Sequence, residues 1–511
     1  MTVAPLRAPT TLTTPWALLT GILGVGSALA AGDLVAGLVA PASSPFLVVG
    51  DRFVRLTPEW LKQAAIAAFG TGDKLALLTG MAVVLAVLAV LAGLAGRRRP
   101  GPGIAVVVAT GAVALVTTTL APTFRAVDLL APLAALLVGT AVYAAVRAAA
   151  AGAARPARHG AGVSRRRALA LAGGVAAGSL LAGAAGRLLA AAPATSGAAV
   201  ALPPAPPAPS LPPDASLPGT PAWLTPSADF YRIDTALQVP RVDPAAWTLR
   251  LHGMVERELT LTLADLRSRR VVEAPVTMVC VSNPVGGTLV SNARFTGVRL
   301  ADLLAEAGVR PGAEQLLSTS VDGFTTGTPV RVVTDGREAL LAFGMNGAAL
   351  PVEHGFPVRM VVPGLYGYVS GCKWITDIEV TTWAGATPYW AERGWAREGP
   401  VKTQSRIDTP AAGATVPSGR VAVAGTSWAP HVGITRVEVA VDGGAWVPAR
   451  LGAEVGVDSW RMWRTEIELG PGEHTLSVRA TDRTGTVQTG REQVSIPDGA
   501  TGRHTVPVTA V

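Results

Sequence analysis

Residues 276–287 read VTMVCVSNPVGG, a short apolar run that opens into a polar segment rich in glycine and proline. The apolar run is typical of a buried strand, and the Asn-Pro and Gly-Gly pairs predict a loop directly after it. Cys280 stands at the junction. Strand ends that open into loops commonly carry binding and catalytic groups, although a cysteine at such a place is more often a small buried hydrophobe. The neighbouring sequence must therefore decide its role.

Further stretches on both sides of Cys280 form an ordered pattern. They are DFYRIDT at 229–235, SNARFTGVRLADLL at 291–304 and MNGAALPVEHGFPVRMVVPGLYGYVSGCKW at 345–374. Together with the cysteine segment they closely resemble the sulfite-oxidase family of molybdenum enzymes. Two tryptophan-bearing stretches, at 442–446 and 460–463, are similar to that family's C-terminal dimerisation domain. The resemblance covers about residues 223–490.

The resemblance implies an oxidoreductase that binds a Mo-molybdopterin cofactor. Its metal needs one soft anionic ligand from the protein, which a thiolate supplies, and Cys280 matches the family's ligand. The pterin carries a phosphate and many hydrogen-bonding atoms, so its pocket needs cations and polar groups from several loops. The family's cofactor-binding positions match six more residues: Arg232, Asp234, Asp322, His354, Arg359 and Lys373. The alternatives are a solvated surface pair for Arg359 and Lys373 and a structural histidine at His354.

One departure from the family concerns the substrate. In animal and plant sulfite oxidases, arginines that bind the oxyanion follow the ligand cysteine closely, whereas residues 281–285 here are VSNPV. Without cations beside the metal, a dianion such as sulfite is less well stabilised. Arg294 could supply a charge from nearby. We therefore expect oxygen-atom transfer on a small sulfur or nitrogen oxo-compound, of which sulfite is one candidate.

The second cysteine, Cys372, lies in the stretch GCKW, where the family varies. We favour a small buried residue. The alternative is a disulfide with Cys280 when the cofactor is absent, because an exterior location favours disulfides. Two cysteines in the sequence also exclude a disulfide framework, a zinc-knuckle spacing and a c-type haem motif.

The first 200 residues have the composition of a membrane segment. They hold 16 basic and only 5 acidic residues, set among long apolar runs; the whole chain is 49% hydrophobic and 15% charged, against about 25% charged in soluble domains. Nucleic-acid binders instead place basic and aromatic residues on a polar domain, so no nucleic acid is expected as a partner. Four runs reach the roughly 20 residues that span a bilayer: about 15–40, 75–96, 103–122 and 126–146.

Arginines set the expected topology. Arg97, Arg98 and Arg99 fill one short loop, and six more arginines follow the fourth run without an acidic residue. The positive-inside rule places both loops and the N-terminus with Arg7 in the cytoplasm. The segment 44–74, of mixed charge, is expected outside as a loop or surface-lying helix. None of the six histidines lies in an apolar run, so the helices offer no bis-histidine haem site.

A fifth, weaker run at about 168–190 directly follows Ser164 and three arginines. The string SRRRALAL resembles a twin-arginine targeting signal, which directs the export of folded, cofactor-loaded proteins, although the pattern usually has Phe where Ala168 or Leu169 stands. An ordinary fifth helix with a basic cytoplasmic flank is the alternative. Both interpretations place the rest of the chain outside the cytoplasm.

The expected fold class is multi-domain. An α-helical membrane bundle is expected at 1–192, followed at 193–222 by a linker whose prolines exclude a helix or central strand. The resemblance implies an α+β molybdopterin domain of the sulfite-oxidase type at 223–400. Short alternating strands separated by Gly, Pro and Asp turns then predict an Ig-like all-β sandwich at 401–500.

These features predict a multi-pass protein of the cytoplasmic membrane with an extracytoplasmic catalytic domain. The sequence offers no cysteine set for an Fe–S cluster and no haem site. An external electron-transfer protein or a quinone must therefore exchange electrons with the molybdenum. A homodimer through the C-terminal domain is a further expectation. The alternative is a non-catalytic, membrane-anchored binding or assembly module on the same fold, which would contain no molybdenum.

Overall fold

A computed structural model describes residues 11–58, 61, 68–69, 72–121, 124–154, 165–191, 202–204 and 211–511. The chain forms two compact units, Met1–Pro193 with Ala236–Gln238, and Ala194–Thr235 with Val239–Val511. Several features considered in the sequence lie outside the described residues: Arg7, Arg155, Arg158, Ser164, parts of the segment 44–74, and half of the linker at 193–222.

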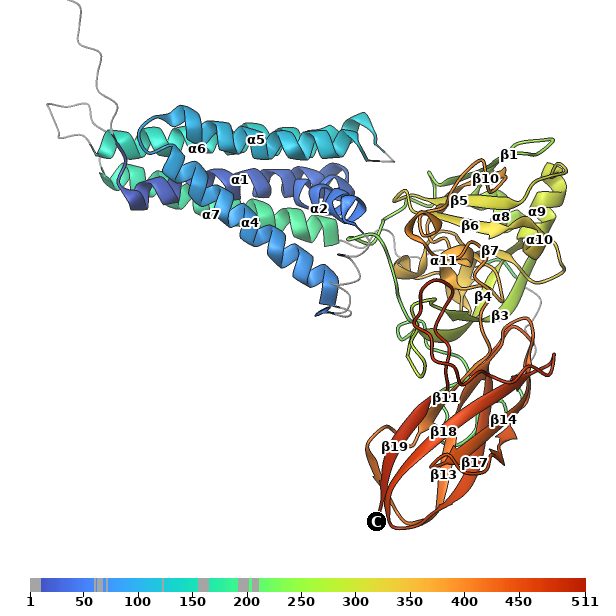
Figure 1. The fold of residues 1–511 in the computed structure, drawn as a ribbon. Coiled ribbons are helices and arrows are strands. Elements are labelled where there is room, and N and C mark those ends of the chain that lie inside the picture. Colours follow the sequence, from blue (N-terminus) through green and yellow to red (C-terminus); the bar gives the residue numbers. More distant parts are fainter. Residues whose placement is uncertain are drawn as a thin grey trace, which may run out of the picture. The chain divides into compact units, whose positions relative to one another are not determined.

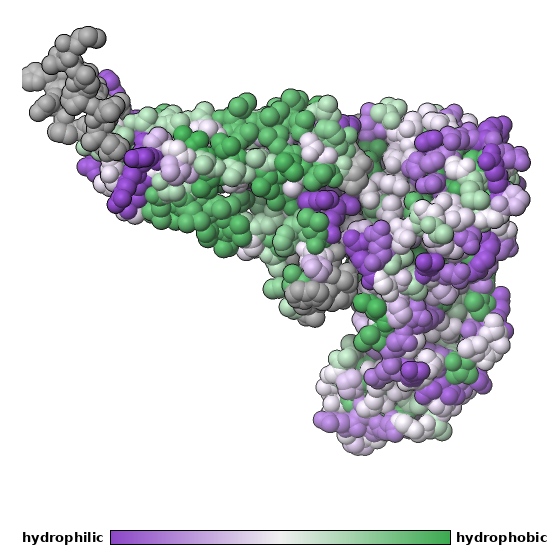
Figure 2. Space-filling view, turned by 45° about the horizontal axis from the view of Figure 1, so that its top comes forward, coloured by the Kyte–Doolittle hydropathy of each residue, from purple (hydrophilic) through white to green (hydrophobic). Residues whose placement is uncertain are grey.

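The first unit is a helical bundle (Figure 1). Its elements are α1 (Thr14–Val39), η1 (Pro41–Ser43), α2 (Pro45–Leu56), α4 (Asp73–Ala95), α5 (Pro100–Thr119), η3 (Ala126–Leu129), α6 (Leu130–Ala153) and α7 (Arg165–Ala191). Within the described part of the chain, five helices are long and apolar enough to cross a membrane. Prolines begin α2 and α5, where the missing N–H costs no intrahelical bond. The face of the bundle drawn in Figure 2 is mostly hydrophobic.

Helix α1 is the common partner in this bundle, because it packs against α4, α6 and α7. On one side the approach is close, since a Cβ on Gly21 would lie 1.9 Å from the carbonyl oxygen of Ala89 in α4. On the side of α7, the hydroxyl oxygens of Ser27 and Ser179 lie 2.8 Å apart. The last helix of the bundle is therefore packed directly onto the first.

The second unit begins with an α+β domain. Its elements are β1 (Thr248–Gly253), β2 (Leu259–Thr262), α8 (Leu263–Ser268), β3 (Val271–Val279), β4 (Val290–Arg299), α9 (Leu300–Ala307), β5 (Gln315–Ser320), β6 (Thr325–Pro329), α10 (Val330–Val333), β7 (Leu340–Met345), β8 (Ala348–Ala349), η5 (Val352–His354), β9 (Arg359–Val361), α11 (Gly367–Ser370), β10 (Ile375–Thr381) and η6 (Ala391–Arg393). They form two five-stranded sheets, one ordered β2-β1-β10-β5-β6 and the other β3-β4-β7-β8 with β9 beside β7.

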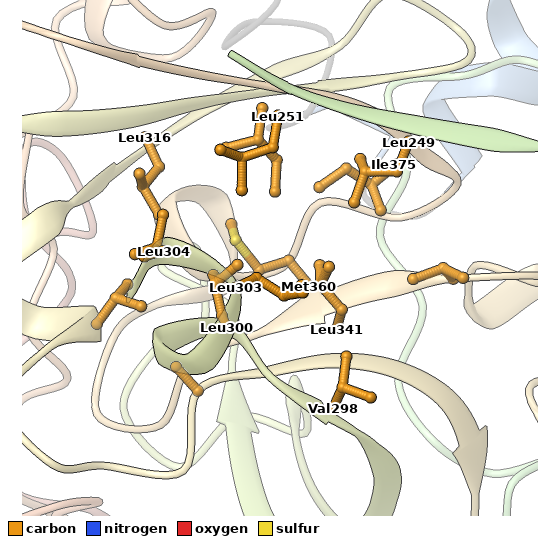
Figure 3. Packing of buried hydrophobic residues seen from close by; sticks show 14 of the residues in the cluster. Leu249, Leu251, Val298, Leu300, Leu303, Leu304, Leu316, Leu341, Met360 and Ile375 are labelled. Carbon is orange, nitrogen blue, oxygen red and sulfur yellow. The ribbon is translucent and has the colours of Figure 1, made fainter. Parts of the chain in front are cut away.

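The core of this domain is filled by leucines from both sheets and from α9 (Figure 3). Leu300, Leu303 and Leu304 of α9 have the i, i+3, i+4 spacing of one helical face, and all three are buried. They belong to the same core cluster as Leu251 of β1 and Met360 of β9. Each such side chain contributes about 1.5–3 kcal/mol on burial. This packing fixes β9, and with it the position of the arginine that begins the strand.

The chain ends in a β-sandwich. Its strands are β11 (Gln404–Thr409), β12 (Ala414–Val416), β13 (Gly419–Trp428), β14 (Ile434–Val441), β15 (Val447–Pro448), β16 (Arg450–Leu451), β17 (Arg461–Leu469), β18 (Gly472–Asp482) and β19 (Thr505–Ala510). One sheet has the order β11-β13-β17-β16 and the other β12-β19-β18-β14-β15. The sandwich includes β19, beyond residue 500, because TVPVTA pairs with β18 and β12 although Pro507 weakens its strand pattern.

Candidate active site

A cavity of about 140 Å³ opens in the α+β domain. Its wall is built from the end of β3, the segment around 230–235, the loop after β5, the loops between η5 and β10, and an aromatic cluster near residue 390. The predicted site residues that line it are Asp234, Cys280, Asp322, His354, Arg359 and Lys373. The fold thus brings together side chains that are up to 139 positions apart in the sequence.

Cys280 begins a loop that its own backbone helps to close. Its N–H donates to the carbonyl oxygen of Leu289 (3.0 Å), and its carbonyl oxygen accepts from the N–H of Asn283 (3.0 Å). The side-chain oxygen of Asn283 accepts from the N–H of Leu289 (2.9 Å). Burial raises the pKa of the thiol, and hydrogen bonds from Ser282 oppose this rise. A bound metal cation would favour the thiolate form.

The guanidinium of Arg359 is itself a buried cation. Its Nη1 donates to the carbonyl oxygen of His354 (3.3 Å), and its Nη2 lies 3.4 Å from the sulfur of Met278. Its Nε has no hydrogen-bond partner, and within the described residues it forms no salt bridge. Burial lowers the pKa of this guanidinium to about 10. An isolated buried charge is costly, so the site fits an anionic group such as the phosphate of a pterin cofactor.

His354 is neutral at physiological pH. Its Nε2 lies 2.9 Å from the carbonyl oxygen of Ser227, which can only accept, so Nε2 carries the proton. Burial, followed by the positive charge of Arg359, lowers the pKa of the ring to about 4. His354 therefore adds no charge to the cavity and keeps Nδ1 as a hydrogen-bond acceptor.

One buried carboxylate, Asp234, holds two cations. It forms an ion pair with Nζ of Lys373, which also donates to the carbonyl oxygen of Ile233 (3.1 Å). Its other oxygen lies 3.0 Å from Nε of Arg232. The Asp234 side chain is 3% exposed, whereas that of Arg232 is 47% exposed. Arg232 thus supports the wall through Asp234, and it is the one predicted site residue that does not line the cavity.

Three other residues considered in the sequence analysis lie in or near this domain's cavity and core. Asp322, in the cavity wall, accepts from the N–H of Phe324 (3.2 Å). Arg294 lies 3.7 Å from Glu273 and does not line the cavity. Cys372 is buried in the core of the domain, and both cysteines are free thiols. The disulfide alternative is therefore absent from this structure.

Aromatic side chains that the sequence analysis did not single out complete the wall. Tyr231, Tyr368, Trp390 and Trp395 all line the cavity. The rings of Trp390 and Trp395 meet edge to face at 6.0 Å, and Tyr368 lies 5.9 Å from Trp395. Aromatic residues make up 5% of the chain, yet three fall within 389–395. That concentration is the signal by which the sequence could have revealed this wall.

Comparisons with known proteins agree with this geometry. Residues 236–390 match a family model described as the oxidoreductase molybdopterin binding domain, and residues 404–478 match a bacterial Ig domain. With the apolar N-terminal helices, these matches confirm the predicted fold class and its order of domains.

Several curated proteins are similar to the chain. Sulfite oxidase of Gallus gallus is 30% identical over 315 residues, which cover 52% of this chain and 68% of that protein. Mitochondrial sulfite oxidase of Homo sapiens is 31% identical over 308 residues, covering 50% and 55% respectively. Nitrate reductase [NADH] 1 of Oryza sativa subsp. japonica is 28% identical, and 36% of its length is matched. The chain thus spans little more than half of the human protein and about a third of the plant protein.

A solved structure shares the fold. The sulfane dehydrogenase SoxCD from Paracoccus pantotrophus matches with a TM-score of 0.51 at 24% identity. The match covers 61% of this chain and 88% of that one. The α+β domain and the sandwich that follows it are therefore a known combination.

Proposed function

The chain belongs to the sulfite-oxidase family of molybdopterin-dependent oxidoreductases, and on this premise we propose that it transfers oxygen atoms to or from a small sulfur or nitrogen oxo-compound. When bound, Mo-molybdopterin supplies the exchange of one oxygen atom and two electrons with the substrate. The observation that carries the proposal is that the thiol of Cys280 and the unpartnered guanidinium of Arg359 line the same cavity. The first matches a soft metal and the second an anion.

The other residues have complementary roles in this proposal. Arg359 binds the pterin phosphate, because its charge has no salt-bridge partner within the described residues. Lys373 is paired with Asp234, which Arg232 also contacts, so it offers an oriented hydrogen-bond donor rather than an unpaired charge. Neutral His354 presents Nδ1 as a hydrogen-bond acceptor to the cofactor, because Nε2 donates to the carbonyl oxygen of Ser227. Asp322 contacts the pterin from the loop after β5, and Arg232 holds Asp234 in place.

The charge of the cavity bears on the substrate class. Val281 and Ser282 are the loop residues beside Cys280 that line the cavity, and both are uncharged. Once Arg359 and Lys373 are assigned to the cofactor, the described lining residues leave no cation for a dianionic substrate. This favours a neutral or singly charged substrate, such as an S-oxide or N-oxide, over sulfite.

We further propose that the helices anchor the protein in the cytoplasmic membrane and that the catalytic domain lies outside. Five helices have the required length and composition. Arg97, Arg98 and Arg99 lie between α4 and α5, and α7 begins at Arg165 with three arginines. The positive-inside rule places these two sites in the cytoplasm, so α7 ends outside. The same arginines support delivery by a twin-arginine route, on which the enzyme crosses the membrane folded around its cofactor.

Partners follow from the same proposal. The sequence holds two cysteines and no site for a haem between its helices, so an external electron-transfer protein or a quinone completes the redox cycle. The C-terminal sandwich, which resembles the family's dimerisation domain, is the proposed homodimer interface.

Molybdenum and pterin analysis of the full chain, purified in detergent, tests the proposal. We expect one molybdenum and one pterin per chain. A screen would then compare sulfite oxidation with the reduction of S-oxides and N-oxides by a dye donor. A folded protein with neither molybdenum nor pterin would support the non-catalytic alternative and overturn the proposal.

A further inference from the structure

The loop after Cys280 is held from outside its own domain. Arg406 in β11 of the C-terminal sandwich donates from Nη1 to the carbonyl oxygen of Gly287 (2.9 Å). The same guanidinium is fixed by Asp408, whose carboxylate lies 2.7 Å from Nε. Both side chains are largely buried, with 11% and 17% exposed. The bond is thus charge-assisted and partly shielded from water.

A second residue of the sandwich, His504, packs against the neighbouring loop residue, Gly286. Gly286 has φ +75°, and a Cβ there would lie 2.1 Å from Cδ2 of His504. The imidazole is oriented from its own domain, because its Nδ1 accepts from the N–H of Ile407 (3.0 Å). Only glycine combines this backbone angle with such a close approach. The imidazole of His504 therefore packs directly against the loop backbone at Gly286.

The strand that leads to Cys280 is tied to the same domain. The N–H of Thr277 in β3 donates to the carbonyl oxygen of Asp458 (2.9 Å), and its hydroxyl oxygen accepts from the N–H of Trp460 (2.6 Å). Thr277 precedes the cysteine by three residues, and Gly287 follows it by seven. The sandwich thus holds the chain on both sides of the thiol.

We propose that the C-terminal sandwich is a positioning element for the thiol of Cys280, and that Arg406 and His504 are its positioning residues. By fixing the loop at 281–289, they set where the sulfur can lie in the cavity. The inference rests on the proposal that this thiol holds the molybdenum. It gives the sandwich a role within each single chain, independent of any homodimer.

The test uses a double variant that keeps the sandwich intact. Arg406→Lys retains a cation beside Asp408 but does not provide the second guanidinium arm that reaches Gly287. His504→Asn retains an acceptor for the N–H of Ile407 but withdraws the ring from Gly286.

The matched control is Arg461→Lys with His474→Asn. Arg461 donates to the carbonyl oxygens of Gly452 (2.9 Å) and Ile434 (2.8 Å), and His474 contacts Asp442 and Gly470. All of these partners lie within the sandwich, so the control perturbs that domain without touching the loop.

Hydrogen exchange in the full chain is the first readout. In the double variant we expect the amides of 281–289 to exchange about tenfold faster, as the loss of a charge-assisted hydrogen bond implies, while β13 and β17 keep their protection. We also expect the molybdenum content per pterin to fall at least about twofold, and kcat to fall with KM unchanged for whichever substrate the screen identifies. The control should match the unmodified protein in all three measurements.

Two outcomes would overturn the inference. One is unchanged exchange at 281–289 in the double variant. The other is faster exchange spread evenly over the sandwich strands, because it would mean general destabilisation. The proposed function fails separately, if Cys280→Ser keeps its molybdenum; the exchange measurement retains its meaning in that case.

Discussion

The Nη1 atom of Arg359 lies 3.3 Å from the carbonyl oxygen of His354, so the cation of one predicted cofactor residue is oriented by the backbone of another. The bond leaves Nε of the guanidinium unpartnered, and the residue is only 4% exposed. Such an arrangement is unfavourable until an anion arrives. The protein should therefore be more stable to unfolding with the cofactor bound than without it.

Arg359→Met should separate cofactor binding from folding. We expect the variant to lose most of its pterin and molybdenum, because the buried anion loses its cation. The cofactor-free variant should be as stable as the cofactor-free parent or more stable by about 1–3 kcal/mol, since a costly buried charge is gone. Metal analysis and thermal unfolding of both forms would check this. Full cofactor loading in the variant would contradict the assignment of Arg359.

The two cysteines should respond differently to replacement by serine. Cys280→Ser should give a folded protein with strongly reduced molybdenum, because a hydroxyl is a harder and less acidic ligand than a thiolate. Cys372→Ser should keep its molybdenum and lose about 1 kcal/mol of stability, since it buries a hydroxyl in an apolar core. Metal content and unfolding midpoints distinguish the two. The reverse pattern would mean that the ligand is Cys372.

His354 predicts how stability depends on pH. Its pKa is about 4 in the folded protein and 6.5 in the unfolded chain. Between these values the unfolded chain binds the proton and the folded chain does not. The free energy of unfolding is therefore unaffected by this histidine above pH 6.5. As the pH falls toward 4, protonation of the unfolded chain lowers that free energy by up to about 3 kcal/mol.

The measurement is the unfolding midpoint of the full chain between pH 4 and 7. In His354→Gln the fall of the unfolding midpoint at low pH should be smaller than in the parent. Some fall should remain, because burial also lowers the pKa of His504. The control His474→Gln, at a histidine whose pKa is raised by Asp442, should leave the acid loss in place. Identical acid profiles for His354→Gln and the parent would refute the assignment.

Reporter fusions test the topology. A reporter fused after residue 100 should lie in the cytoplasm, and one fused after residue 210 should lie outside. The positive-inside rule, applied to the arginines at 97–99 and 165–167, predicts this orientation. An external reporter at 100 together with a cytoplasmic one at 210 would invert the proposed topology and place the enzyme inside the cell.

The export route is tested by replacing Arg165, Arg166 and Arg167 with lysine. Positive charge is retained, so an ordinary fifth helix should insert as before. A twin-arginine receptor reads guanidinium geometry, so on that route the catalytic domain should remain in the cytoplasm. Protease digestion of spheroplasts reports which side it occupies. Unchanged digestion would argue against folded export and leave the cofactor assignment intact.

The sequence predicted side chains that share one cavity where these residues lie in recognisable local stretches; their roles in a site stay a prediction. Cys280, His354, Arg359 and Lys373 line the cavity as the motif order suggested. The sequence could not reveal that Arg232 lies outside the cavity and pairs with Asp234 in its wall. That placement depends on which side of a turn faces inward.

Long-range contacts were equally hidden from the sequence. Trp390 and Trp395 reach the cavity from a segment 110 or more positions beyond Cys280. Arg406 and His504 reach the cysteine loop from another domain. No local periodicity encodes such pairings, since they arise only when the sheets and the sandwich have packed. The apolar runs of the N-terminal unit, in contrast, are local signals, and each of them coincides with most of one long helix.

The contact between α1 and α7 has a consequence for the order of events during synthesis. Helix α1 is made first, but the partner that meets Ser27 is not complete until residue 191 has left the ribosome. The bundle therefore remains open on one side while the intervening helices are made. It is closed by the very helix that begins with the three arginines and precedes the catalytic half of the chain. On the proposed topology, completion of the anchor and delivery of the enzyme then share one late step, so a chain delayed at that step also has an unfinished anchor.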